Sequence, residues 1–101
     1  MDELLEWLRS QHSGVNTYVG FRKRSLALRT GEPESAAAAR LLADIAGQLI
    51  DAYDAQPFPV DVADRTHRRL TELVGKAAKA RTGKPSEQLE VLNELGLADL
   101  T

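Results

Sequence analysis

Two histidines and a few carboxylates are the residues of this sequence that could hold a metal ion. The chain has no cysteine, which excludes disulfides, thiol catalysis and cysteine metal sites. His12 falls on an apolar helical face, and His67 follows Asp64 by one turn without the repeated Glu-x-x-His motif of di-iron bundles. The carboxylates that could complete a site share one stripe of another predicted helix and are Asp44, Asp51 and Asp54. Since lone histidines usually make structural hydrogen bonds, we predict no metal and no cofactor.

Nucleophilic and phosphate-binding motifs are also missing from the sequence. None of the serines has the strand–turn–helix context of a nucleophile elbow. The run Arg-Thr-Gly-Lys-Pro at 81–85 lacks the second glycine and the preceding strand of a phosphate-binding loop. We therefore predict no catalytic residue and expect a protein that is not an enzyme.

Two groups of basic residues could instead bind phosphate, because Lys/Arg sets supply much of the affinity of nucleic-acid-binding proteins. One group follows Gly20, and the other lies on the outer face of a helix predicted after Pro59. Their members are Arg22, Lys23 and Arg24 in the first group, and Arg65, Arg68, Arg69, Lys76 and Lys79 in the second. A nucleic-acid-binding protein is therefore the alternative function. A helix-turn-helix over the last two predicted helices is excluded, because Glu87 and Glu90 would repel a phosphate backbone.

The distribution of charge along the chain favours another use of these basic residues. The net charge is −2, but the segments 1–31, 32–56, 57–85 and 86–101 carry +2, −4, +4 and −4 in turn. In an up-down bundle each basic helix would lie beside an acidic one. Internal charge complementarity is therefore favoured over nucleic-acid binding.

The elements that must position these side chains are helices. Residues 36–53 predict the helix around which the others are arranged, since their apolar arc is wider than one neighbouring helix can cover. We expect this helix to have partners on two sides, either as the central helix of a bundle or between subunits, and to end near Asp54. No stretch shows the two-residue alternation of a strand.

The other helices are marked by their first residues and by glycines. The first starts at the N-terminus and could break or kink at Gly14 or Gly20, the third is capped by Asp61, and the short fourth by Ser86. The predicted fold is all-α, an antiparallel bundle of three long helices plus a short C-terminal fourth helix. It forms a single helical-bundle domain over 1–101.

Apolar residues that exceed the needs of one core predict a partner surface. The three features are the wide arc of 36–53, the off-register positions of two residues in the first helix, and a C-terminal tail with Leu92, Leu95, Leu97 and Leu100. The predicted contacts are Trp7, Tyr18, Phe21, Leu28, Ile50 and Tyr53. We therefore expect a non-enzymatic protein–protein interaction or regulatory protein that self-associates as a homodimer or docks a helical partner.

Composition places the chain among globular proteins. Its 101 residues are 43% hydrophobic and 28% charged, which is not a disordered composition. Acidic residues at the N-terminus exclude a signal peptide, and no window approaches the ~18 apolar residues of a membrane span. We expect a cytoplasmic protein with no membrane partner.

Overall fold

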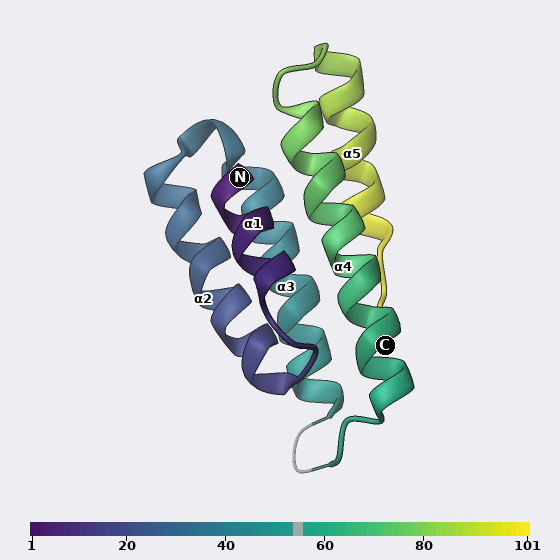
Figure 1. Cartoon of the computed structure of the whole chain (residues 1–101). Coiled ribbons are helices and arrows are strands. Elements are labelled where there is room, and N and C mark those ends of the chain that lie inside the picture. The colour runs from purple at the N-terminus through teal and green to yellow at the C-terminus, as the bar shows by residue number, and fades with distance from the viewer. Residues whose placement is uncertain (54–55) are drawn as a thin grey trace.

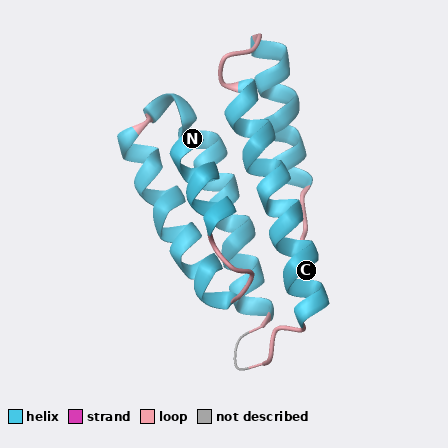
Figure 2. Cartoon of the chain, viewed as in Figure 1, coloured by secondary structure: helices cyan, strands magenta, loops and turns pink. Residues whose placement is uncertain are grey.

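The computed structural model describes residues 1–53 and 56–101, and all of the regular structure in this part of the chain is helical (Figure 2). The elements are α1 (Asp2–Ser10), α2 (Val15–Gly31), a short 3-10 turn η1 (Pro33–Ser35), α3 (Ala36–Ala52), α4 (Val60–Ala80) and α5 (Pro85–Leu97). Five α-helices pack together, with α2 at one edge of the view and the α4–α5 hairpin at the other (Figure 1). The prediction of an all-helical protein is confirmed. Asp54, where the central helix was expected to end, lies outside the described residues.

The first predicted helix is two helices in the structure. The chain leaves the helical conformation at Gln11, which is extended at φ −94° and ψ 152°, and α2 begins after Gly14. The helix then continues through Gly20, where a Cβ would stand only 3.1 Å from the Trp7 ring of α1. Gly20 is therefore a contact point between α1 and α2 rather than a kink.

The break before α2 also changes which of its side chains face the core. The inward face of α2 carries Tyr18, Phe21 and Ser25, each with no exposed surface. Phe21 and Leu28 looked off-register only because one continuous helix from the N-terminus was assumed. With a separate α2, Phe21 belongs to the core and Leu28 packs against it.

Helix α3 has neighbours on two sides, as its wide apolar arc predicted. It packs most extensively against α2, and α5 covers another part of its circumference. Small residues lie four positions apart on one side of α3, at Ala39, Ala43 and Gly47, and the Arg22 side chain of α2 lies over Gly47. Ala43 is buried and Ile50 packs against the core. The wide arc is therefore satisfied within one chain and requires no second subunit.

One core joins all five helices. Helices α1 and α4 each present one apolar face to it, and α5 contributes a single buried leucine. The largest buried apolar side chains are Leu8, Tyr18, Phe21, Leu42, Leu49, Leu70, Leu73, Val74 and Leu95. Burying a leucine side chain stabilises a fold by about 1.5–3 kcal/mol, so this set supplies the main driving force.

The connection from α3 to α4 closes one end of the core with aromatic rings. Phe58 lies between two prolines, and its ring centroid is 4.2 Å from that of Tyr53 and 5.7 Å from that of Tyr18. The structure thus agrees with the expectation that Phe58 covers an end of the core.

Two helices begin slightly earlier than predicted. Helix α4 starts at Val60, directly after Pro59, and α5 starts at Pro85, so Asp61 and Ser86 lie in first turns rather than at caps. Proline fixes φ near the helical value and is favoured at such starts. Over the described residues, no helix combines the length and the apolar character needed to cross a bilayer.

Candidate interaction surfaces

His67 and Asp64 join α4 to the first part of the chain. His67 Nε2 lies 2.9 Å from the carbonyl oxygen of Leu8, so this nitrogen donates to the last turn of α1. The Ser13 hydroxyl donates to Asp64 at 2.6 Å, which ties the α1–α2 connection to α4. His12 is exposed. Over residues 1–53 and 56–101, no three His, Asp or Glu side chains gather as metal ligands would.

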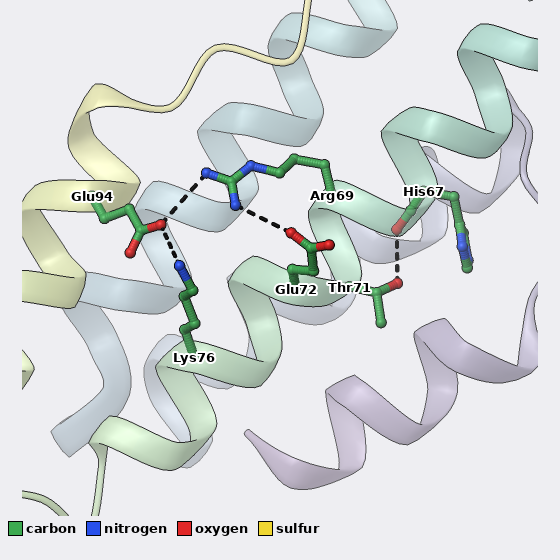
Figure 3. Close-up of polar contacts among 6 residues, drawn as sticks. All are labelled: His67, Arg69, Thr71, Glu72, Lys76 and Glu94. Atoms are coloured by element: carbon green, nitrogen blue, oxygen red, sulfur yellow. Dashed lines mark hydrogen bonds and ion pairs between the residues drawn. The ribbon is translucent and has the colours of Figure 1, made fainter.

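Glu94 of α5 is the acidic partner of the basic face of α4. Its Oε1 lies 2.8 Å from Lys76 Nζ and 3.5 Å from Arg69 Nη2, and Arg69 also reaches Glu72 (Figure 3). Hydrogen bonding from Lys76, with a smaller effect from Arg69, lowers the pKa of Glu94. Two of the predicted nucleic-acid contacts, Arg69 and Lys76, are therefore engaged within the chain.

The basic residues of α2 point in different directions. The Arg24 guanidinium lies over the Trp7 ring, 4.4 Å from its centroid. Arg22 crosses Gly47 of α3, where a Cβ would meet its Nε at 3.4 Å. Lys23 is exposed. The predicted phosphate-binding residues of α2 thus do not form one cluster, and those that remain exposed on α4 are Arg65, Arg68 and Lys79.

Glu32, at the end of α2, joins both halves of the bundle. Its Oε2 accepts a hydrogen bond from the Met1 ammonium at 2.6 Å, and its Oε1 lies 2.5 Å from Arg81 Nη1 at the end of α4. Arg81 also pairs with Glu34. The Met1 ammonium, and then Arg81, lower the pKa of the Glu32 carboxyl, although partial burial opposes this shift.

A cleft of about 470 Å³ opens beside Arg81, where α3 and α4 diverge. Its apolar floor comes from three helices and consists of Ala37, Ala38, Ala77, Ala80, Val91 and Leu92. Alanines on the facing helices leave this space unfilled. Residues of the turn η1, Glu34 and Ser35, and Gln88 of α5 complete its lining.

The six residues predicted to contact a partner differ in how far their side chains are buried in the structure. Tyr18 and Phe21 have no exposed surface, and the Tyr18 hydroxyl donates to the Ala63 carbonyl at 3.3 Å. They cannot line a surface, because the separate phase of α2 turns them inward. The remaining four are partly buried and are Trp7, Leu28, Ile50 and Tyr53. Two of the three sequence features that predict association are thus satisfied within the chain.

The third feature, the C-terminal leucines, is exposed only in part: Leu97 is exposed, whereas Leu92 is partly buried and Leu100 packs against the core. Leu97 is 85% exposed and Leu89 is 59% exposed, whereas Leu95 is buried. Leu89 and Leu97 are eight residues apart on α5, about two turns or 12 Å. The α5 outer face is defined here as Leu89, Asn93 and Leu97, with the exposed acid Glu90 beside them and the exposed acid Glu87 at its edge, where the Glu87 carboxylate also lies against Gly83.

Leu97 is among the apolar residues of the tail that the sequence predicts as a partner surface, whereas Leu89 is not. The angular positions of the leucines on the helix contain information on their exposure: Leu97 is 200° from Leu95, so one helix cannot bury both against the same core.

Comparisons with protein-family models, with curated proteins and with solved structures found no match for this chain. The functional argument therefore depends on the surfaces themselves.

Proposed function

We propose that this chain is a non-enzymatic protein–protein interaction module that self-associates through the α5 outer face. The observation that carries this proposal is the exposure of Leu97 and Leu89, 85% and 59%. Covering an exposed leucine side chain stabilises an association by about 1.5–3 kcal/mol. Apolar anchors along one face of a helix are also typical of helix-in-groove recognition.

The packing of α5 supports the same proposal. Only Leu95 of this helix is buried, and Val91 and Leu92 are partly buried. The helix is held by these three side chains and by the ion pairs of Glu94. The fold therefore uses one side of α5 and leaves its outer side available to a partner.

The chemistry of the titratable groups also supports a binding role over catalysis. His67 and Glu94 each contact another helix, and Asp64 contacts the α1–α2 connection, through a hydrogen bond or an ion pair. Glu32 does the same through Arg81. These groups stabilise the fold, and none of them lines the α5 outer face.

Sedimentation velocity over a micromolar concentration series tests this proposal. We expect the wild-type sedimentation coefficient to rise with concentration and the variant Leu89→Ser/Leu97→Ser to stay monomeric. Val60→Ser is the matched control, because Val60 is 76% exposed but lies at the start of α4. A wild-type protein that remains monomeric throughout the series would contradict the proposal.

Nucleic-acid binding remains the alternative function. Its support is the exposure of Arg65, Arg68 and Lys79 on α4 and of Lys23 on α2. The geometry supports it less, because Arg69 and Lys76 face Glu94. The alternative predicts binding to mixed-sequence DNA or RNA that weakens steeply with salt. An absence of binding at low salt would remove it.

A further inference from the structure

Helix α5 is uniformly acidic, and α2 is uniformly basic. Between Pro85 and Leu97 the only charged residues are Glu87, Glu90 and Glu94. Between Val15 and Gly31 the only charged residues are Arg22, Lys23, Arg24 and Arg29. The two helices thus have net charges of opposite sign.

Both helices also expose apolar side chains beside these charges. On α2, Val19 is 44% exposed and lies one turn before Lys23, on the side facing away from the core. On α5, Leu89 and Leu97 lie beside Glu90. Among the described residues, no ion pair engages Glu87, Glu90, Arg22 or Lys23. Each helix therefore presents an outer face with the charge and the apolar anchors that suit the other.

These two faces cannot meet within one molecule. Helix α2 lies at one edge of the bundle and α5 at the opposite edge, with α3 and α4 between them (Figure 1). Any contact between the two faces must therefore involve two copies of the chain.

We propose that the α5 outer face of one copy binds the outer face of α2 on a second copy. This face of α2 is defined by Val19 with Lys23 on one side and, at the border with α3 where its side chain also crosses Gly47, Arg22 on the other. This inference rests on the proposed function, since it names the partner surface of that self-association. The contact is heterologous, because two different patches meet, so the copies join head to tail. It would bury the two leucines of α5 against Val19 and place Glu87 and Glu90 opposite Arg22 and Lys23.

The chemistry of the contact sets its strength and its salt dependence. Two helices that meet through a few apolar anchors bury an area at the low end of specific interfaces, so we expect association in the micromolar range. Exposed charge pairs are screened over about 10 Å at 0.1 M ionic strength. Association should therefore weaken as salt is raised, whereas a contact made by leucines alone would not.

Charge reversal on each face gives a direct test by sedimentation velocity at low salt. The first variant is Arg22→Glu/Lys23→Glu, and the second is Glu87→Lys/Glu90→Lys. Each alone should associate at least about tenfold more weakly than wild type, because like charges then oppose each other. An equimolar mixture of the two should associate again, since it pairs reversed α2 with reversed α5. Thermal melts followed by circular dichroism check that both variants fold as wild type does.

The outcomes separate this inference from the proposed function. A wild-type protein that is monomeric at every concentration overturns both. A wild-type protein that associates while Arg22→Glu/Lys23→Glu associates equally well overturns the inference alone, because α5 then binds something other than α2. Failure of the mixed variants to associate also overturns it. Restored association of the mixture, with weak association of each variant, supports the head-to-tail contact.

Discussion

Tyr18 is the residue whose environment differs most from that of a free side chain. Its ring is fully buried, its hydroxyl donates to the Ala63 carbonyl at 3.3 Å, and Asp64 lies nearby. Burial, with a smaller effect from the negative charge of Asp64, raises the pKa of Tyr18 to about 12. The neutral phenol is therefore part of the native packing between α2 and α4.

The raised pKa of Tyr18 predicts a loss of stability in alkali. Above pH 10 the unfolded chain releases this proton while the native protein retains it, so the free energy of unfolding falls between pH 10 and about 12. A shift of this size corresponds to about 3 kcal/mol. Urea unfolding of wild type and Tyr18→Phe over this pH range should show a difference that disappears or reverses at the alkaline end. Tyr53→Phe is the control, and a constant difference between wild type and Tyr18→Phe would contradict the assignment.

Glu32 predicts the opposite pH dependence. Its lowered pKa, caused first by the Met1 ammonium and then by Arg81, means that the carboxylate stabilises the fold above its unfolded pKa. This contribution is lost as the pH falls through the native pKa. Glu32→Gln should lower the free energy of unfolding by roughly 1 kcal/mol at neutral pH and by nothing in acid. Chemical unfolding at both pH values measures it, and an equal loss at both would show that the charge is not the cause.

At the scale of elements, the glycines distinguish open helix surface from contact points. In the interior of α4, a Cβ on Gly75 would meet no heavy atom within 4 Å. On α3, a Cβ on Gly47 would touch the flexible Arg22 side chain at an ordinary 3.4 Å, whereas on α2 one on Gly20 would crowd the Trp7 ring at 3.1 Å. The sequence does not separate these three cases, because the difference lies in what each helix packs against.

These contacts predict three different results for glycine-to-alanine substitution. Gly75→Ala and Gly47→Ala should raise the free energy of unfolding by up to about 1 kcal/mol, the difference in helix propensity between the two residues. Gly20→Ala should gain less or lose stability, because Trp7 must move and its contact with Arg24 is disturbed. Thermal or urea unfolding of the three variants measures this order. Equal stabilisation at all three sites would mean that Trp7 does not pack on Gly20.

The sequence predicted where the helices lie better than which side of each helix faces the core. The wide apolar arc of 36–53 indicated a helix with two-sided contacts, and α3 has them. In the sequence, the break at 11–14 is indicated only by a weak point at Gly14. The residues around it are compatible with a continuous helix and with a broken one. That break decides which side of α2 faces the core, so Phe21 was placed at a surface although it is fully buried.

At the scale of the whole molecule, core leucines and exposed leucines should behave differently. Leu42→Ala should lower the free energy of unfolding by about 2–5 kcal/mol, because Leu42 has no exposed surface. Leu97→Ala should change it by less than about 0.5 kcal/mol at a concentration where the protein is monomeric. Urea unfolding of both variants in dilute solution makes the comparison. A large loss for Leu97→Ala would mean that Leu97 serves the fold rather than a partner.

The candidate surface depended on information that the sequence carries incompletely. Its acidic charge and its leucines were evident, but their exposure follows from which side of α5 contacts α3 and α4. Only Leu95 of α5 is fully buried, and this depends on the packing of the whole bundle. The pairing of Glu94 with Arg69 and Lys76 likewise required the positions of both helices.

A dilution series followed by two-dimensional NMR tests the central claim most directly, since it locates the contact residue by residue in the unmodified protein. We predict that the methyl signals of Leu89 and Leu97 shift with concentration, together with those of Val19 on α2. The signals of the buried Leu8 and Leu42 should stay unchanged. Shifts confined to other surfaces, or no shifts over the micromolar to millimolar range, would contradict an interaction through the α5 outer face.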